Sequence, residues 1–215
     1  MILIKTVTLL TIMYFFTACL QDQPKVPKKA AEIAMSDVKT ILVYPFYQDH
    51  TNITGIMRET LSEAAREGTP LFNVVTLKAT SKAIEQTQLT PKEFFTYKSL
   101  LKVAHKTKSD AVLFGSVEET NSTEKVTFED RTRCKEGKCW SIKVMCKQRQ
   151  QHFVATLNLL KVRQKKRIYT KQFKQDQTWH HCADDHNKIP SALEAKQILA
   201  QKIAKKFVSK LIPEY

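Results

Sequence analysis

The hydrophobic positions in the first half of the chain predict an alternation of strands and helices. Three continuous apolar runs rich in β-branched residues are typical of buried strands: residues 40–47, 71–77 and 111–117. Between the first two, residues 51–66 place apolar side chains at helical spacing, and Gly68 follows where a C-terminal cap is expected. A second helix is predicted to begin at Thr90, because Thr90 and Glu93 have the spacing of a capping box. Two successive strand–helix–strand units predict parallel pairing with right-handed crossovers.

The second half of the chain changes to alternating segments followed by one long helix. Four segments predict antiparallel strands joined by polar turns: residues 125–133, 140–146, 152–162 and 167–174. An amphipathic helix over 191–211 closes the chain, and Ser191 and Glu194 form its capping box. Its predicted buried stripe is Leu193, Ala200, Ile203, Ala204, Phe207 and Leu211. The expected fold is therefore one mixed α/β (α+β) domain over 40–215, with a β-α-β-α-β start, an antiparallel meander and a C-terminal helix packed on the sheet.

The first 18 residues have the features of a secretory signal peptide. Lys5 supplies a positive charge, and residues 6–18 are almost wholly apolar or hydroxylic. As a helix this run spans roughly 20 Å, which is too short for a stable membrane anchor. Phe16-Thr17-Ala18-Cys19 then resembles a lipobox, which predicts cleavage before Cys19 and lipidation of that cysteine. The alternative is a buried N-terminal helix that carries a cysteine by chance.

Residues 19–39 are predicted to tether the domain to the lipid. The segment holds Pro24, Pro27 and the basic pair Lys28-Lys29, and such polar, proline-containing segments act as extended spacers. Leu20 follows the lipidated cysteine, where an Asp would retain a lipoprotein at the inner membrane. We therefore expect a periplasm-facing protein anchored to the outer membrane.

The charge of the chain favours anionic surroundings. Its 35 Lys and Arg against 21 Asp and Glu give a formal net charge of +14, which attracts acidic lipid headgroups, cell-wall carboxylates and acidic proteins. An exported protein does not meet nucleic acid, so no nucleic-acid partner is expected. Because the lysines are spread along the chain, a well-solvated surface is the competing explanation.

Four cysteines besides Cys19 are expected to form disulfides in an oxidising compartment. Glu136-Gly137 predicts a two-residue hairpin turn, which would place Cys134 and Cys139 face to face at the next non-hydrogen-bonded position. Cys146 lies seven residues beyond Cys139 and so points to the opposite face, which leaves it to meet Cys182. Free thiols and a metal site remain alternatives to this pairing.

The segment around Cys182 also contains the densest set of potential metal ligands in the chain. His180, His181, Cys182 and His186 form the candidate set, with Asp184 and Asp185 nearby. Imidazole and thiolate together suit zinc or copper. The spacing matches no standard zinc motif, and surface loop histidines are the alternative explanation.

Catalytic motifs are not found in the sequence. It has no Gly-x-Ser-x-Gly, no phosphate-binding glycine loop and no His-Glu-x-x-His, and it holds only 4 glycines. Asp184-Asp185 could be a catalytic carboxylate pair, but a solvated loop is the ordinary explanation for two adjacent aspartates. We therefore expect neither enzymatic activity nor a cofactor.

Three segments give the chain a resemblance to a known group of proteins. Ile41-Leu42-Val43-Tyr44-Pro45-Phe46, Phe72-Asn73-Val74-Val75 and the run from Ala104 to Val117 resemble periplasmic lipoproteins of the curli-secretion-lipoprotein type. That group shares an α/β domain with the N-terminal domain of the Tol-system translocation protein and with lipoprotein activators of penicillin-binding proteins. The segment from Cys134 to Cys146 departs from the common pattern.

The resemblance implies an accessory part of a secretion, flagellar or cell-wall assembly. The expected function is thus a non-enzymatic outer-membrane lipoprotein that scaffolds or regulates such an assembly, and the alternative is a periplasmic metal-binding lipoprotein. Candidate partners are the outer membrane through the lipid anchor, other envelope proteins, further copies of this chain, and anionic cell-wall or lipid surfaces.

Overall fold

The computed structural model of the chain describes residues 31–66, 68–186 and 188–212. Its main sheet has five strands in the order β4-β1-β5-β6-β7. The strands are β1 (Thr40–Val43), β4 (Asn73–Val74), β5 (Ala111–Lys135), β6 (Lys138–Lys161) and β7 (Lys166–Cys182). β1 pairs in parallel with β4 and β5, whereas β5, β6 and β7 are antiparallel. The predicted mixed α/β fold with a single mixed sheet is confirmed.

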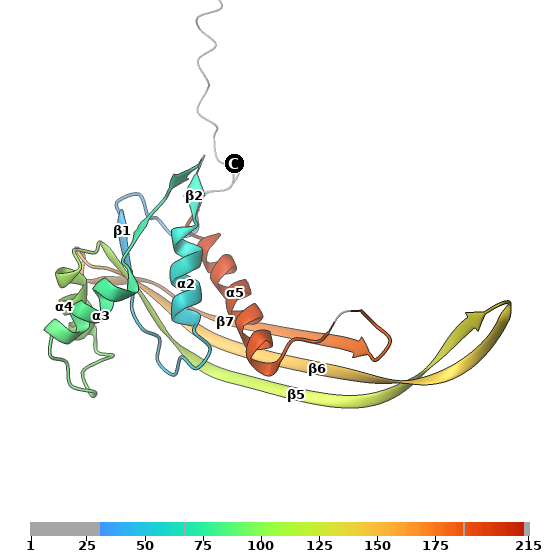
Figure 1. The fold of residues 1–215 in the computed structure, drawn as a ribbon. Helices are drawn as coiled ribbons and strands as arrows, with labels where there is room; N and C mark the ends of the chain where they lie inside the picture. Colours follow the sequence, from blue (N-terminus) through green and yellow to red (C-terminus); the bar gives the residue numbers. More distant parts are fainter. Residues whose placement is uncertain (1–30, 67, 187, 213–215) are drawn as a thin grey trace, which may run out of the picture.

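Helices cover both faces of the sheet (Figure 1). The front face carries α2 (Ile53–Ser62) and α5 (Ala192–Val208), and the back face carries α3 (Leu77–Gln86) and α4 (Tyr97–Lys106). The alternation of side chains along the strands sends Leu113, Leu157 and Leu159 into the front core, whereas Leu42, Val112 and Leu160 enter the back core. The two cores explain why the first strands are apolar on both faces.

Helix ends follow local hydrogen bonding, and one start was predicted wrongly. α5 begins as expected, since the Ser191 hydroxyl and the Glu194 carboxylate form a reciprocal capping box. α4 does not begin at Thr90. The Glu93 carboxylate accepts from the backbone N–H of Thr90 at 3.2 Å within an isolated turn, and Thr96 caps the helix instead. The buried Tyr44 hydroxyl donates to the Phe94 carbonyl at 2.6 Å, which holds this turn outside the helix.

Two further predictions about the helices were wrong. Leu193 is 53% exposed, because it falls on the solvent side of α5, and Ala195 and Leu199 complete the buried stripe in its place. Gly68 does not cap α2, which ends at Ser62. It lies between β2 (Ala65–Arg66) and β3 (Thr69–Pro70), which form a small separate antiparallel pair, and its φ of +80° suits this turn.

Four strands were predicted for the antiparallel meander, but the structure has three long strands there, β5, β6 and β7. β5 runs on from the buried core without a break, and residues 140–146 and 152–161 belong to the single strand β6. A register shift between Val117 and Glu119 is the main irregularity of β5. Residues 147–151 were expected to form a turn, and residues 118–124 were assigned to no strand, because neither segment shows an apolar alternation. Both are strand segments whose two faces are largely polar.

The N-terminal segment joins the domain earlier than predicted. Ile33, Met35 and Val38 are buried in the front core, and the backbone N–H of Ile33 donates to the carbonyl of Lys210 at 3.1 Å. Part of the expected tether is therefore packed structure. The predicted signal peptide, Cys19 and the first part of the tether lie outside the described residues. Within the described ranges, no helix is long and apolar enough to cross a membrane.

Gly115 is predicted to tolerate no side chain, because β6 and the segment that follows β1 approach β5 closely there. A Cβ on Gly115 would lie 2.1 Å from the Thr156 carbonyl oxygen and 2.7 Å from the ring of buried Phe46. Gly115→Ala should therefore lower the free energy of unfolding by about 3 kcal/mol, as overpacking of a core does. The neighbouring Ser116→Ala should stay within about 0.5 kcal/mol. Urea denaturation measures both, and equal stability of the two variants would contradict this close approach.

Candidate functional site: the disulfide-pinned arm

The last strands extend past the helices as an arm. We define the arm as residues 119–152 of β5 and β6 together with residues 176–182 of β7. Figure 1 shows β5 and β6 continuing beyond the end of β7. Two-stranded ribbons are marginally stable in water, so this distal part of the arm requires stabilisation other than a hydrophobic core.

Two disulfides join cysteines that lie directly opposite each other in the ladder. Cys134 is bonded to Cys139 (S–S 2.05 Å) at the arm tip, and Cys146 is bonded to Cys182 (S–S 1.96 Å) where β7 ends. Positive φ angles at Glu136 (53°) and Gly137 (76°) fit the predicted two-residue turn. These are the same two pairs that the strand geometry predicts from the sequence, and they lie at the two ends of the distal ribbon.

The loop after Cys182 folds back across the arm. The Arg131 guanidinium contacts the Asp184 and Asp185 carboxylates, each at 3.0 Å, and Arg133 contacts Asp184 at 3.4 Å. The backbone N–H of Cys182 donates to Asp185 at 2.7 Å. That hydrogen bond, followed by the one from Arg131, lowers the pKa of Asp185 below its ordinary value of 3.8. Asp184-Asp185 therefore ties the end of β7 to β5.

One cluster on the back face combines potential metal ligands with a disulfide. Ligand atoms of Glu129, Cys146, His180 and Cys182 lie within 4.8 Å of one another. His180 Nε2 is 2.9 Å from the Glu129 carboxylate and 4.0 Å from Cys182 Sγ. Because the two sulfurs are bonded to each other, neither is a thiolate, which is the form that binds zinc.

The predicted metal loop is not assembled as the sequence suggests. Successive residues of a strand point to opposite faces, so His181 lies on the front face while His180 and Cys182 lie on the back. His186 is exposed in the loop. The set His180, His181, Cys182 and His186 therefore does not converge on one point, and the metal-binding alternative is not favoured. Glu129 was missed, and only the strand register could have identified it.

The front face of the arm exposes apolar side chains. Val126 (53% exposed), Phe128 (69%) and Met145 (43%) lie together there, and Phe128 is directly opposite Met145. A hollow of about 300 Å³ begins beside Met145 and reaches Ile189 in the loop before α5. Contiguous exposed apolar surface of this kind marks interaction sites.

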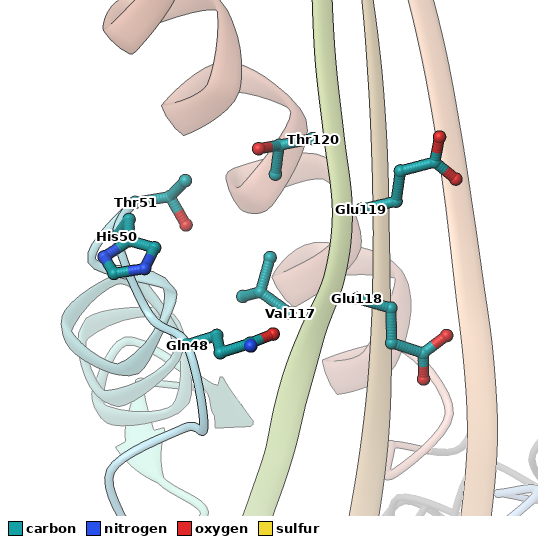
Figure 2. A pocket seen from close by; sticks show the side chains of 7 residues that line it. All are labelled: Gln48, His50, Thr51, Val117, Glu118, Glu119 and Thr120. Atoms are coloured by element: carbon teal, nitrogen blue, oxygen red, sulfur yellow. The ribbon is translucent and has the colours of Figure 1, made fainter.

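A second, polar hollow of about 250 Å³ lies where the arm leaves the core. In Figure 2, Val117 and Thr120 point toward His50 and Gln48, whereas Glu118 and Glu119 point to the other side of β5. The register shift between Val117 and Glu119 produces this arrangement. The shift turns both carboxylates away from the His50 imidazole, so the hollow does not bring a carboxylate and an imidazole together.

Comparison with known proteins finds distant structural neighbours only. No protein-family model matches the sequence, and no curated protein matches it. Similar structures include the LpoB C-terminal domain from Salmonella enterica (14% identity, 75% of this chain and 92% of that one, TM-score 0.41). Lipoprotein GNA1162 from Neisseria meningitidis gives 15% identity, coverages of 80% and 99%, and a TM-score of 0.42.

A third neighbour is the PelC dodecamer from Paraburkholderia phytofirmans, with 16% identity, 87% of this chain and 94% of that one covered, and a TM-score of 0.37. Structural similarity at such low identities and TM-scores does not indicate a shared function. The resemblance to curli-secretion and Tol-type proteins is not shown by these neighbours and stays a prediction.

The two disulfides are predicted to contribute unequally to stability. The Cys146–Cys182 bond closes 36 residues and the Cys134–Cys139 bond closes 5. In the chain-entropy model the losses on removal are roughly 4 and roughly 2 kcal/mol, respectively. Paired Cys→Ala variants of each bridge, compared by urea denaturation, should show this order. A smaller loss for Cys146→Ala/Cys182→Ala than for the tip pair would contradict it.

Acid is predicted to loosen the loop after β7. The lowered pKa of Asp185 means that its carboxylate stabilises the folded loop at neutral pH, and this contribution is lost as pH falls through the folded pKa, below 3.8. Asp185→Asn should therefore lower the melting temperature at about pH 7 but have little effect at about pH 2. Asp130→Asn, an exposed change on the same arm, is the control. A pH-independent effect of Asp185→Asn would refute the linkage.

Proposed function

We propose that the protein is a non-enzymatic lipoprotein of the bacterial envelope that docks onto a larger assembly through its arm. The observation that supports this most directly is the arm itself: a disulfide-stapled ribbon that leaves the core and exposes Val126, Phe128 and Met145 on one face. An ordered, exposed apolar surface of this kind is better suited to binding a partner protein than to catalysing a reaction.

The free edge of β5 offers a second means of contact. Within the described residues, β5 pairs with β1 over Ala111–Leu113 and forms one bridge from Ser116 to Tyr47. From Glu119 onward, the backbone N–H and C=O groups on its outer edge are therefore available to another strand. Strand addition at such an edge, with side-chain pockets for specificity, is a recurrent mode of recognition.

Export and anchoring complete the proposal. The predicted signal peptide ending at Ala18, the predicted lipobox cysteine Cys19 and the two disulfides all agree with an oxidising compartment outside the cytoplasm. Anchored at its N-terminus, the domain would present the arm to a scaffold, a secretion channel or cell-wall machinery. The metal-binding alternative receives no comparable support, because its ligands do not converge.

A photo-crosslinking amino acid at position 128 tests the proposal. Introduced in place of Phe128 in the full chain in growing bacteria, it should give a discrete higher-mass adduct, because the side chain stands on the exposed front face of the arm. The same amino acid in place of Lys82, which is exposed on α3, is the matched control and should give none.

Mass spectrometry of the adduct would identify the partner, whether another envelope protein or a second copy of this chain. Absence of any adduct from positions 126, 128 and 145 would count against docking through the arm. Identical adducts from position 82 and the arm would do so as well, because they would reflect random collisions.

A further inference from the structure

A strongly basic turn lies at the end of the sheet opposite the arm tip. Four of the five positions from 163 to 167 are basic and exposed: Arg163 and Lys165 in the turn after β6, and Lys166 and Arg167 at the start of β7. Within the described ranges, none of the four forms an ion pair. Arg167 makes a long hydrogen bond to Asn158 at 3.4 Å. The charge of Arg163 helps to lower the pKa of Asp37, whereas the charges of Lys165, Lys166 and Arg167 are left for an external anion.

Aromatic side chains meet this turn from the other side of a groove. The groove has a volume of about 480 Å³ and is lined by Phe95, Tyr97, Leu100, Phe114, Lys165, Lys166 and Arg167. Phe95 is 44% exposed and Tyr97 is 43% exposed. The apolar wall comes from residues at and just before the start of α4 and from β5, and the cationic wall comes from Lys165 in the β6–β7 turn and from the first two residues of β7. The volume falls in the range of small-ligand sites.

The aromatic wall is held in place before any ligand arrives. The Phe95 ring lies edge-on to Tyr47 at 5.1 Å and to Phe94 at 4.9 Å. Tyr44 packs against Phe94 at 5.3 Å and donates its hydroxyl proton to the Phe94 carbonyl. Rings fixed in this way lose little freedom on binding. A rigid apolar wall beside three unpaired cations matches a ligand that carries apolar and acidic groups next to each other.

We propose that this groove binds an extended segment of a partner protein in which a bulky apolar side chain is flanked by acidic residues. The apolar side chain would enter between Phe95, Tyr97 and Phe114, and the carboxylates would pair with Lys165, Lys166 and Arg167. The rings line the walls of a hollow of about 480 Å³, whose shape suits a projecting side chain. The groove is separate from the arm, so neither proposal depends on the other.

Selection of peptides from a random library tests this inference. Phage-displayed 12-residue peptides are panned against the full-length protein in detergent, and the enriched peptides are synthesised and titrated. We expect them to combine Asp or Glu with Phe, Tyr, Trp or Leu. Lys165→Glu/Lys166→Glu should weaken their binding at least about tenfold, because attraction at the cationic wall becomes repulsion. Added salt should weaken binding to the unmodified protein.

Matched variants separate the groove from general effects of charge and apolarity. Lys205→Glu/Lys206→Glu makes the same change of charge at an exposed pair on α5 and should alter affinity less than about twofold. Phe95→Ala/Tyr97→Ala should weaken binding as strongly as the groove lysine pair, whereas Phe128→Ala on the arm should not. If the aromatic pair reduces folding, as circular dichroism would show, the lysine pair still decides the result.

Three results would overturn the inference. The first is that no acidic, apolar peptide is enriched. The second is that the enriched peptides bind the groove and control lysine pairs equally well. The third is that phosphatidylglycerol vesicles bind in a manner that depends on Lys165 and Lys166 while peptides do not, which would make the site a lipid contact. Failure of crosslinking at position 128 would concern the arm alone.

Discussion

The backbone ladder between β5 and β6 is the constraint on which the rest of the molecule depends. It begins in the core, where Ala111 pairs with Lys161, and continues to the tip, where Lys135 pairs with Lys138. The shift between Val117 and Glu119 changes which side chains of β5 face forward. Beyond it, Val126 and Phe128 share the front face with Met145, and Glu129 and Arg131 share the back face with Cys146. Both faces of the arm follow from this one irregularity.

Covalent and ionic contacts stabilise the arm where a hydrophobic core cannot. Its back face buries only a small cluster of Val144, Cys146 and Cys182, with Ile142 packed against it. The Cys146–Cys182 bond secures the end of β7, and Arg131 draws the following loop over β5 through Asp184 and Asp185. The front face carries the Cys134–Cys139 bond at the tip and, nearer the core, the apolar side chains that we propose meet a partner. Each face of the ribbon thus carries one disulfide, and the front face also exposes Val126, Phe128 and Met145.

Sequence patterns correctly predicted the features of the fold that depend on residues close together in the chain or on burial of one face of an element. The capping box of Ser191 and Glu194 and the hairpin turn at Glu136-Gly137 fixed a helix start and a cysteine pair, because both involve neighbours in the chain. Residues 147–151 carried no strand signal, since periodicity marks strands only where one face is buried. Thr96 displaced Thr90 as helix cap through a tertiary hydrogen bond from Tyr44. The aromatic and basic groove joins α4 to the β6–β7 turn, and no local pattern could reveal it.

Amide hydrogen exchange of the oxidised protein, read residue by residue, tests the continuous β5–β6 ladder most directly. We predict slow exchange, as far as the tip, for those amides of β6 between Cys139 and Gln150 that donate to β5 or β7. Reduction and alkylation should speed exchange chiefly between Cys139 and Cys146, on the tip side of the end of β7, where only two strands remain. Exchange in this segment as fast as in an unstructured peptide, with the disulfides intact, would contradict an ordered arm and the role assigned to it.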